Sequence, residues 1–235
     1  MFMEPKLKNL IEKSKNIVFF GGAGVSTESG IPDFRSEGGI YSRVYEYPPE
    51  VILSHTFFCS KTEDFFSFYR ERMLFLDAQP NKAHYALAEL EKAGKLKAVI
   101  TQNIDNLHQK AGSKTVFELH GNVYRNYCTL CNKFFPIGAI TATTGVPHCD
   151  CGGIIKPDVV LYEEQLDDRT LYCSVEALRR ADLLIIGGTS LKVYPAAGLI
   201  DYYGGDNIVE INKTPTAADS RATLIYNSPI GEILG

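Results

Sequence analysis

Two close pairs of cysteines are the clearest candidates for chemistry in this sequence: Cys128 with Cys131, and Cys149 with Cys151. Four thiolates bind zinc in a tetrahedral site, and such a closed site leaves no position for a water molecule. We therefore expect a structural zinc. A site of three cysteines and His148 stays open as an alternative, because His148-x-x-Cys151 has the usual spacing of a zinc knuckle.

Polar residues follow two apolar runs further along the chain. His120 comes directly after the run at 116–119, and Gln102, Asn103 and Asp105 follow another run. Parallel sheets bind ligands at the carboxyl ends of their strands, so these side chains are candidates for a binding site. They could equally lie in exposed turns, where they would need no buried partner. The spacing alone leaves both interpretations open.

A glycine-rich run, GGAG at residues 21–24, separates an expected strand from an expected helix that Pro32 stops. A strand, a glycine-rich turn and a helix together form an arrangement that cradles a pyrophosphate. Glycines also occur in such turns for steric reasons alone, so this second interpretation stays open. The GxGxxG spacing is missing, and so is an acidic residue on a strand about 20 positions later. A hydride-transfer dehydrogenase therefore fits poorly.

The elements that must position these residues alternate along the chain. Strands are expected at 16–20, 96–101, 115–119, 182–187, 207–212 and 222–226. Helices are expected at 6–13, 25–30, 63–76, 83–93, 169–180 and 196–203. Such alternation is typical of a Rossmann-like α/β fold, a parallel sheet with helices on both faces.

Residues 121–153 interrupt this alternation. They hold four of the six cysteines and show little regular periodicity, so we expect a small inserted zinc-ribbon module there. The Rossmann-like domain would then comprise residues 1–120 and 154–235. The module would be part of a small domain that also takes in residues 38–80, including the long irregular segment 38–49. Long loops of this kind are often functional.

Composition excludes several classes of protein. The 235 residues are 45% hydrophobic, enough for a sizeable core, and carry a net charge of −4. A slightly acidic chain is a poor general binder of nucleic acid, which needs many cations. No apolar stretch approaches the roughly 20 residues of a membrane span, and the N-terminus lacks the apolar segment of a signal peptide. We expect a cytoplasmic monomer with reduced cysteines, in which the isolated Cys59 and Cys173 lie in the core.

The run GAGVSTESGIPDFRS at residues 22–36 resembles the sirtuin signature GAGxSxxSGIPDFRS at every defined position. Four further blocks are similar to sirtuin motifs and occur in the family's order: TQNIDNLH at 101–108, ELHG at 118–121, KPDVV at 156–160 and GTSL at 188–191. On these motifs the sequence is identified as a member of the sirtuins, of bacterial or archaeal type.

This resemblance implies an NAD-dependent protein-lysine deacetylase or deacylase, an enzyme of the transferase class. Such an enzyme cleaves NAD, its co-substrate, to nicotinamide and transfers the acyl group from lysine to ADP-ribose. Its partners would be acyl-lysine proteins or peptides, with no binding to nucleic acid or membrane. A mono-ADP-ribosyltransferase that uses the same NAD pocket is the alternative. The resemblance also favours the four cysteines as the ligands of the structural zinc.

The resemblance assigns roles to individual residues. His120 would be the general base toward a ribose hydroxyl, and Asn103 would also act in catalysis. Asp105, with the Ile104 backbone, would hold the nicotinamide carboxamide. The full set expected to contact NAD is Ala23, Gly24, Thr27, Asp33, Phe34, Arg35, Gln102, Asn103, Ile104, Asp105, His120, Gly188, Thr189, Ser190, Asn212 and Ile230. The peptide would lie between segments 159–163 and 192–194, in contact with Val160, Tyr162, Lys192, Val193 and Tyr194.

Two positions depart from the family's pattern or match it ambiguously. Glu163 stands where the family usually has glycine. Its carboxylate is either a solvated surface charge or gives the enzyme a preference for substrates with basic residues beside the target lysine. Tyr69-x-x-Arg72 has the spacing of a pair that reads acidic acyl groups in one sirtuin subclass. Alignment from Met73 puts Phe66 and Tyr69 there instead, which would favour acetyl groups.

Overall fold

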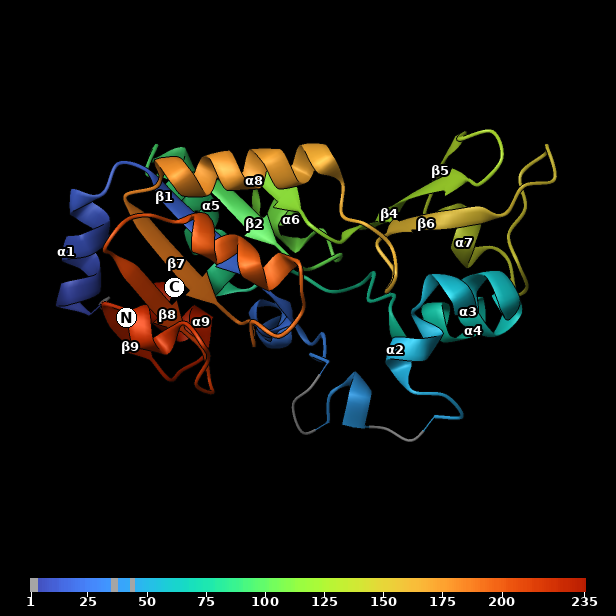
Figure 1. The fold of residues 1–235 in the computed structure, drawn as a ribbon, viewed down its shortest axis with the longest axis horizontal. Helices are drawn as coiled ribbons and strands as arrows, with labels where there is room; N and C mark the ends of the chain where they lie inside the picture. Colours follow the sequence, from blue (N-terminus) through green and yellow to red (C-terminus); the bar gives the residue numbers. More distant parts are fainter. Residues whose placement is uncertain (1–3, 35–37, 43–44) are drawn as a thin grey trace.

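The computed structural model describes residues 4–34, 38–42 and 45–235. They form two parts, which Figure 1 shows side by side: a parallel sheet with its helices, and a smaller antiparallel sheet beside several short helices. The expected α/β fold, with helices around a parallel sheet and a small additional unit, is confirmed.

The larger sheet has six parallel strands in the order β3-β2-β1-β7-β8-β9. Their bounds are β1 Ile17–Gly21, β2 Leu96–Thr101, β3 Val116–Glu118, β7 Leu183–Gly187, β8 Ile208–Ile211 and β9 Leu224–Tyr226. All six were expected from the sequence, close to these bounds. The central strands β1 and β7 are buried along their whole length, as is typical of parallel strands that are covered on both faces.

Helices cover both faces of this sheet. Ile17 and Phe19 of β1 pack into one apolar cluster, and the alternating Val18 and Phe20 pack into another on the opposite face. The first face is covered by α1 (Pro5–Lys13), α5 (Lys82–Lys92) and α9 (Ile230–Leu234), and the second by α8 (Asp168–Arg180) and the 3-10 helix η4 (Ala196–Tyr202). No helix within the described ranges is long and apolar enough to cross a membrane.

Three expected helices differ from those observed. The helix expected at 25–30 is instead two 3-10 turns, η1 (Ala23–Val25) and η2 (Thr27–Ser29). The Thr27 hydroxyl donates to the Gly24 carbonyl, and Gly30 ends the second turn in a left-handed conformation. Local side-chain bonds of this kind compete with an α-helix. Residues 196–203 likewise form a 3-10 helix, and the helix expected at 63–76 ends at Arg72 as α4 (Thr62–Arg72).

The smaller sheet has the order β5-β4-β6 and is antiparallel. It comprises β4 (Gly121–Cys128), β5 (Phe134–Pro136) and β6 (Ile155–Val159). Its apolar cluster also takes in residues of α2 (Pro49–Ile52), α3 (His55–Ser60), α4 and α7 (Gly138–Thr141). The remaining short elements are η3 (Ile40–Ser42), α6 (Leu107–Ala111) and η5 (Asp219–Arg221). Because β6 pairs with β4, we propose that the small domain extends to Val159 and includes residues 38–80.

Candidate active site and metal centre

The order of the strands fixes where the candidate site lies. From β1 the chain moves outward to β2 and β3 on one side, and from β7 outward to β8 and β9 on the other. The crevice where such an order reverses, beyond the carboxyl ends of the strands, is where open α/β sheets bind ligands. Here that point lies between β1 and β7. The segments that follow these strands hold most of the residues expected to contact a ligand.

Backbone contact between two glycines joins the segments after β1 and β7. Gly24 N–H donates to the Gly188 carbonyl at 2.8 Å. A Cβ on Gly24 would lie 2.7 Å from Gly188 Cα, and a Cβ on Gly188, whose φ is +60°, would lie 2.3 Å from Val25 N. Only glycine fits at either position. Close backbone packing between the two segments therefore requires glycine at both positions.

A hydrogen-bonded cluster follows β2. The Ser26 hydroxyl donates to Asp105 Oδ2 at 2.6 Å and accepts from Asn103 Nδ2 at 3.1 Å. The other carboxylate oxygen of Asp105 accepts from Leu107 N–H at 2.9 Å, at the start of α6. Burial raises the pKa of Asp105, and the bonds from Ser26 and Leu107 oppose that rise. A partly buried carboxyl group is thus held in one orientation beside the crevice.

Ser26 is a site residue to which the sequence analysis gave no role. Its side chain is 1% exposed and links Asn103 to Asp105. The sequence signal that could have identified Ser26 is its position inside the run at 22–36. Its burial explains the two contacts, because a buried hydroxyl needs hydrogen-bond partners.

The imidazole of His120 lies just past the end of β3 and is partly buried. Its Nδ1 lies 3.0 Å from the Gln102 carbonyl oxygen. A carbonyl oxygen only accepts, so Nδ1 carries the proton and Nε2 keeps a lone pair in the neutral ring. Burial lowers the pKa of His120, while the bond to Gln102 opposes that change. The ring is therefore neutral at pH 7, with Nε2 able to accept a proton.

A chain of hydrogen bonds crosses the crevice from Gln102 to the segment after β8. Gln102 Nε2 donates to the Thr189 hydroxyl at 2.9 Å, and Thr189 N–H donates to Asn212 Oδ1 at 2.9 Å. Asn212 in turn donates to Glu210, whose pKa is raised by burial. Residues from both halves of the chain are thus brought together at the crevice.

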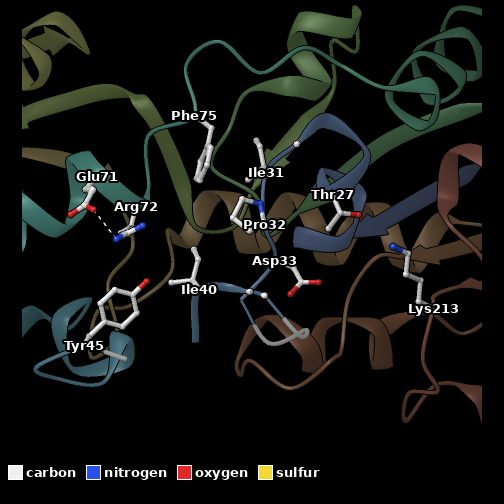
Figure 2. Close-up of a pocket in the computed structure, with 13 residues that line it drawn as sticks. Thr27, Ile31, Pro32, Asp33, Ile40, Tyr45, Glu71, Arg72, Phe75 and Lys213 are labelled. Atoms are coloured by element: carbon white, nitrogen blue, oxygen red, sulfur yellow. Dashed lines mark ion pairs between the residues drawn. The ribbon is translucent and has the colours of Figure 1, made fainter. Parts of the chain in front are cut away.

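A cavity of about 540 Å³ opens beside this crevice (Figure 2). Two of the residues expected to contact NAD, Thr27 and Asp33, line it together with Lys213. At one end Arg72 forms an ion pair with Glu71 at 2.7 Å, as Figure 2 shows. The other lining residues are Gly30, Ile31, Pro32, Gly38, Gly39, Ile40, Tyr45 and Phe75.

Some of the expected residues lie elsewhere. Arg35 is outside the described residues. The side chain of Ile230 is 2% exposed and packs in the core with Phe19, whereas Ser190 is exposed. Phe34 packs edge-on against Tyr41, with ring centroids 5.5 Å apart.

Neither of the two residue pairs considered for recognition of the acyl group, Tyr69 with Arg72 or Phe66 with Tyr69, lines this cavity as a pair. Tyr69 is fully buried in the small domain and stacks on Phe65 at 5.7 Å, and Phe66 is also fully buried. Burial raises the pKa of the Tyr69 phenol. Arg72 lines the cavity, but Tyr69 does not.

In one of the two segments expected to flank the peptide, the main chain of Tyr162 already has hydrogen-bond partners. Tyr162 N–H donates to Leu53, and the Tyr162 carbonyl accepts from His55 N–H. The main chain of Tyr162 is therefore already paired, so only its side chain, 36% exposed, is open to a peptide. Tyr194, on the opposite segment, is 75% exposed.

Glu163 adopts a left-handed conformation with φ of +74°, which glycine adopts most readily. Its carboxylate accepts from the backbone N–H of Thr56 at 2.9 Å and from the Thr56 hydroxyl at 2.7 Å. These bonds lower the pKa of Glu163. The carboxylate is therefore hydrogen-bonded at the start of α3. This favours the interpretation of Glu163 as a surface charge over a direct contact with basic residues of the peptide.

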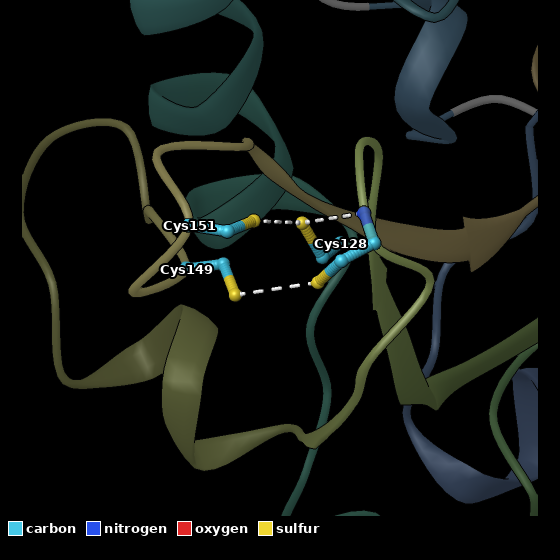
Figure 3. A group of neighbouring side chains, drawn as sticks. Cys128, Cys149 and Cys151 are labelled. Carbon is cyan, nitrogen blue, oxygen red and sulfur yellow. Dashed lines mark hydrogen bonds between the residues drawn. The ribbon is translucent and has the colours of Figure 1, made fainter.

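The sulfur atoms of the four paired cysteines lie within 4.8 Å of one another, and Figure 3 labels Cys128, Cys149 and Cys151 of this group. Cys128 Sγ lies 3.4 Å from Cys151 Sγ, and Cys131 Sγ lies 3.7 Å from Cys149 Sγ. Zinc–sulfur bonds of about 2.3 Å place the sulfurs of a tetrahedral site about 3.8 Å apart, so the cluster fits zinc.

His148 does not join this cluster. Its Nδ1 faces the Gly152 carbonyl at 3.3 Å, and all four sulfur atoms lie within 4.8 Å of one another without it. Of the other two cysteines, Cys59 is exposed and Cys173 is partly buried. The expectation that Cys59 lies in the core is therefore wrong: it sits on the outer face of α3, with its Sγ 3.4 Å from His55 Nε2.

Comparison with known proteins gives consistent matches over nearly the whole chain. The sequence model of the Sir2 family matches residues 22–195. A protein of Clostridium acetobutylicum named NAD-dependent protein deacetylase is 60% identical over 97% of this chain and 95% of its own length. One of the same name from Staphylococcus aureus is 44% identical over 97% of this chain and 95% of its own length.

Two solved structures are similar throughout. One, of Sir2 with a deacetylated p53 peptide and 3'-O-acetyl-ADP-ribose, has a TM-score of 0.91 and 41% identity, and covers 99% of this chain and 96% of its own. Another, of Sir2 with a p53 peptide and NAD, has a TM-score of 0.87 and 40% identity, and covers 98% of this chain and 95% of its own.

Proposed function

The chain belongs to the Sir2 family, and from this premise we propose that it is an NAD-dependent protein-lysine deacetylase. It cleaves NAD, as a co-substrate, to nicotinamide and transfers the acyl group from lysine to ADP-ribose. The observation that carries this proposal is the His120 ring, whose Nδ1 donates to the Gln102 carbonyl so that Nε2 keeps its lone pair, together with the hydrogen-bonded cluster of Asn103 and Asp105.

His120 acts as the general base toward a ribose hydroxyl. Its fixed tautomer supports this role, because the ring accepts a proton at Nε2 without first rotating. The lowered pKa supports it further, since the neutral form persists below the ordinary pKa of about 6.5. Asn103 orients the nicotinamide ribose from the other side.

Asp105 holds the carboxamide of nicotinamide, together with the Ile104 backbone. Ser26 fixes the orientation of the carboxyl group, and burial raises its pKa while the bonds from Ser26 and Leu107 oppose that rise. Thr189 and Asn212, which are already bonded to each other, contact the adenosine side. The other NAD contacts proposed are Ala23, Gly24, Thr27, Asp33, Phe34, Arg35, Gln102, Gly188, Ser190 and Ile230, the last through its backbone.

Zinc is held by Cys128, Cys131, Cys149 and Cys151 and has a structural role. A four-thiolate zinc cross-links the module and supplies folding energy. Backbone N–H groups of Leu130 and Cys131 point at Cys128 Sγ, at 3.4 and 3.5 Å, and would stabilise a thiolate there.

Acyl-lysine proteins or peptides are the substrates, bound between segments 159–163 and 192–194. Val160, Lys192, Val193 and Tyr194, with the Tyr162 side chain, contact the peptide. We further propose that the protein acts in the cytoplasm as a monomer and does not bind nucleic acid. The net charge of −4 supports the last point.

Mass spectrometry of the products tests this function. An acetyl-lysine peptide incubated with the protein and NAD should yield free lysine peptide, nicotinamide and O-acetyl-ADP-ribose, and nothing without NAD. A peptide or protein that gains ADP-ribose while the acetyl-lysine stays intact would instead identify a mono-ADP-ribosyltransferase.

A further inference from the structure

His120 lies where the chain leaves the large sheet and enters the small one. Glu118 is the last residue of β3, and Gly121 is the first of β4. Gly121 has φ of +78°, and a Cβ there would lie 1.9 Å from the Asp158 carbonyl oxygen. The turn is therefore packed closely against β6, so the backbone beside His120 is held where the two sheets meet.

Arg125 bridges the two sheets across this turn. It lies on β4, where the pairing with β6 is irregular between Asn122 and Asn126. Its Nη1 donates to Glu118 Oε2 on β3 at 2.7 Å, and its Nε donates to Asp158 Oδ2 on β6 at 2.7 Å. One guanidinium thus connects both sheets and encloses the turn between residues 118 and 125.

Glu118 is otherwise a fully engaged carboxylate. Its Oε1 accepts from Gln109 Nε2 at 2.7 Å and from Asn122 Nδ2 at 2.5 Å, and its side chain is only 9% exposed. Among the described residues, Arg125 is the only cation paired with it. Loss of Arg125 would leave a buried negative charge without its partner, two residues before His120.

We propose that Arg125 is a positioning residue, whose two-point contact with Glu118 and Asp158 fixes the turn that carries His120. This inference rests on the proposed function of His120 as general base. The fork of the guanidinium suits it to hold two carboxylates in a fixed relative position, which a single ammonium group does less well. Displacement of a catalytic group by about 1 Å can cost about 100-fold in rate.

The base-dependent step can be measured apart from the step before it. Exchange of labelled nicotinamide into NAD, in the presence of acetyl-peptide, needs both substrates bound but needs no base. Deacetylation needs the base as well. The ratio of deacetylation to exchange therefore reports the position of His120, whereas lost folding or weaker substrate binding lowers both rates together.

The test compares Arg125→Met with Arg179→Met, a control that removes an exposed arginine whose ion pair lies on α8. Arg125→Met should lower the ratio on the order of 10-fold, and Arg179→Met should leave it unchanged. Asp158→Asn, which keeps an acceptor for Nε, should lower the ratio less than Asp158→Ala.

A folded Arg125→Met protein with the ratio of the unaltered enzyme would overturn the inference. Where that variant does not fold, Arg125→Lys takes its place, and a normal ratio in folded Arg125→Lys overturns the inference equally. His120→Ala is measured in parallel. If it retains full deacetylation, the general-base assignment itself fails, which is distinct from failure of the Arg125 inference alone.

Discussion

Acid should destabilise this protein well above the pH at which carboxylates titrate, because two neutral histidines are buried together. His84 and His108 are 0% and 1% exposed, and their ring centroids lie 4.7 Å apart. Among the residues that the structure describes, none is a hydrogen-bond partner of His84 Nε2 or of either ring nitrogen of His108. Burial lowers the pKa of His84 to about 4, and burial together with the neighbouring His84 holds the pKa of His108 well below its ordinary value.

The direction of this pH effect follows from the protonation of the two histidines in the folded and the unfolded protein. Both imidazoles are neutral in the folded protein, whereas in the unfolded chain they take up protons below a pKa of about 6.5. Their contribution to stability is therefore lost as pH falls from about 6.5 toward the folded pKa values. Between pH 8 and pH 5 each histidine lowers the free energy of unfolding by about 2 kcal/mol. The pair removes about 4 kcal/mol, against a total of about 5–15 kcal/mol for a typical domain.

Urea denaturation followed by circular dichroism at pH 5 and pH 8 measures this loss; the chain has no tryptophan to serve as a fluorescent probe. His108→Gln cannot take up a proton in either state, so it should lose about 2 kcal/mol less than the unaltered protein between these two pH values. Tyr85→Phe, an exposed change on the same helix as His84, is the control and should keep the full loss. The reasoning is refuted if His108→Gln loses as much stability as the unaltered protein.

The remaining predictions concern the site and the zinc module. His120→Ala should reduce deacetylation about 10²–10⁴-fold while nicotinamide exchange persists. In the unaltered enzyme, deacetylation should fall with acid only below about pH 6.5, because burial lowers the pKa of the base; pH–rate profiles and exchange assays check both points. Asp105→Asn should weaken inhibition by nicotinamide more than binding of ADP-ribose, as calorimetry can measure, and equal losses would contradict the assignment. Chelation should remove about one zinc per chain and lower the melting temperature. Cys149→Ala should lose zinc while His148→Ala retains it, and the reverse result in metal analysis would favour the histidine-containing site.

The large sheet could be predicted because its central strands are short apolar runs buried on both faces. Residues 17–21 and 183–187 carry that signal in every position. The small sheet lacks it. Its β4 is irregular between Asn122 and Asn126 and does not alternate. Its β6 does alternate, but it is short and contains Pro157, which counts against a strand. The pairing of β4 with β6 joins residues that are distant in the sequence, and the local pattern of apolar and polar residues does not reveal such a pairing.

The candidate site followed from one rule, that ligands bind beyond the carboxyl ends of parallel strands. That rule, with the motifs, singled out His120, Asn103 and Asp105, and the structure brings these residues to one edge of the sheet. It did not reveal Ser26 or the bridge formed by Arg125, because both depend on side-chain contacts between elements far apart in the chain. The 3-10 turns after β1 were also missed, since hydroxyl–backbone bonds there override the helical pattern.

The central position of β1 has a consequence for how the protein is made. β1 pairs with β2 on one edge and with β7 on the other, and Leu183 of β7 lies far along the chain from Ile17. At about 5–20 residues per second, a ribosome needs on the order of ten seconds or more to synthesise that interval. Throughout this time the nascent chain presents one edge of an apolar strand without its native neighbour, and such edges invite aggregation. The interval before β7 emerges is therefore the period in which the nascent chain is most open to aggregation through β1.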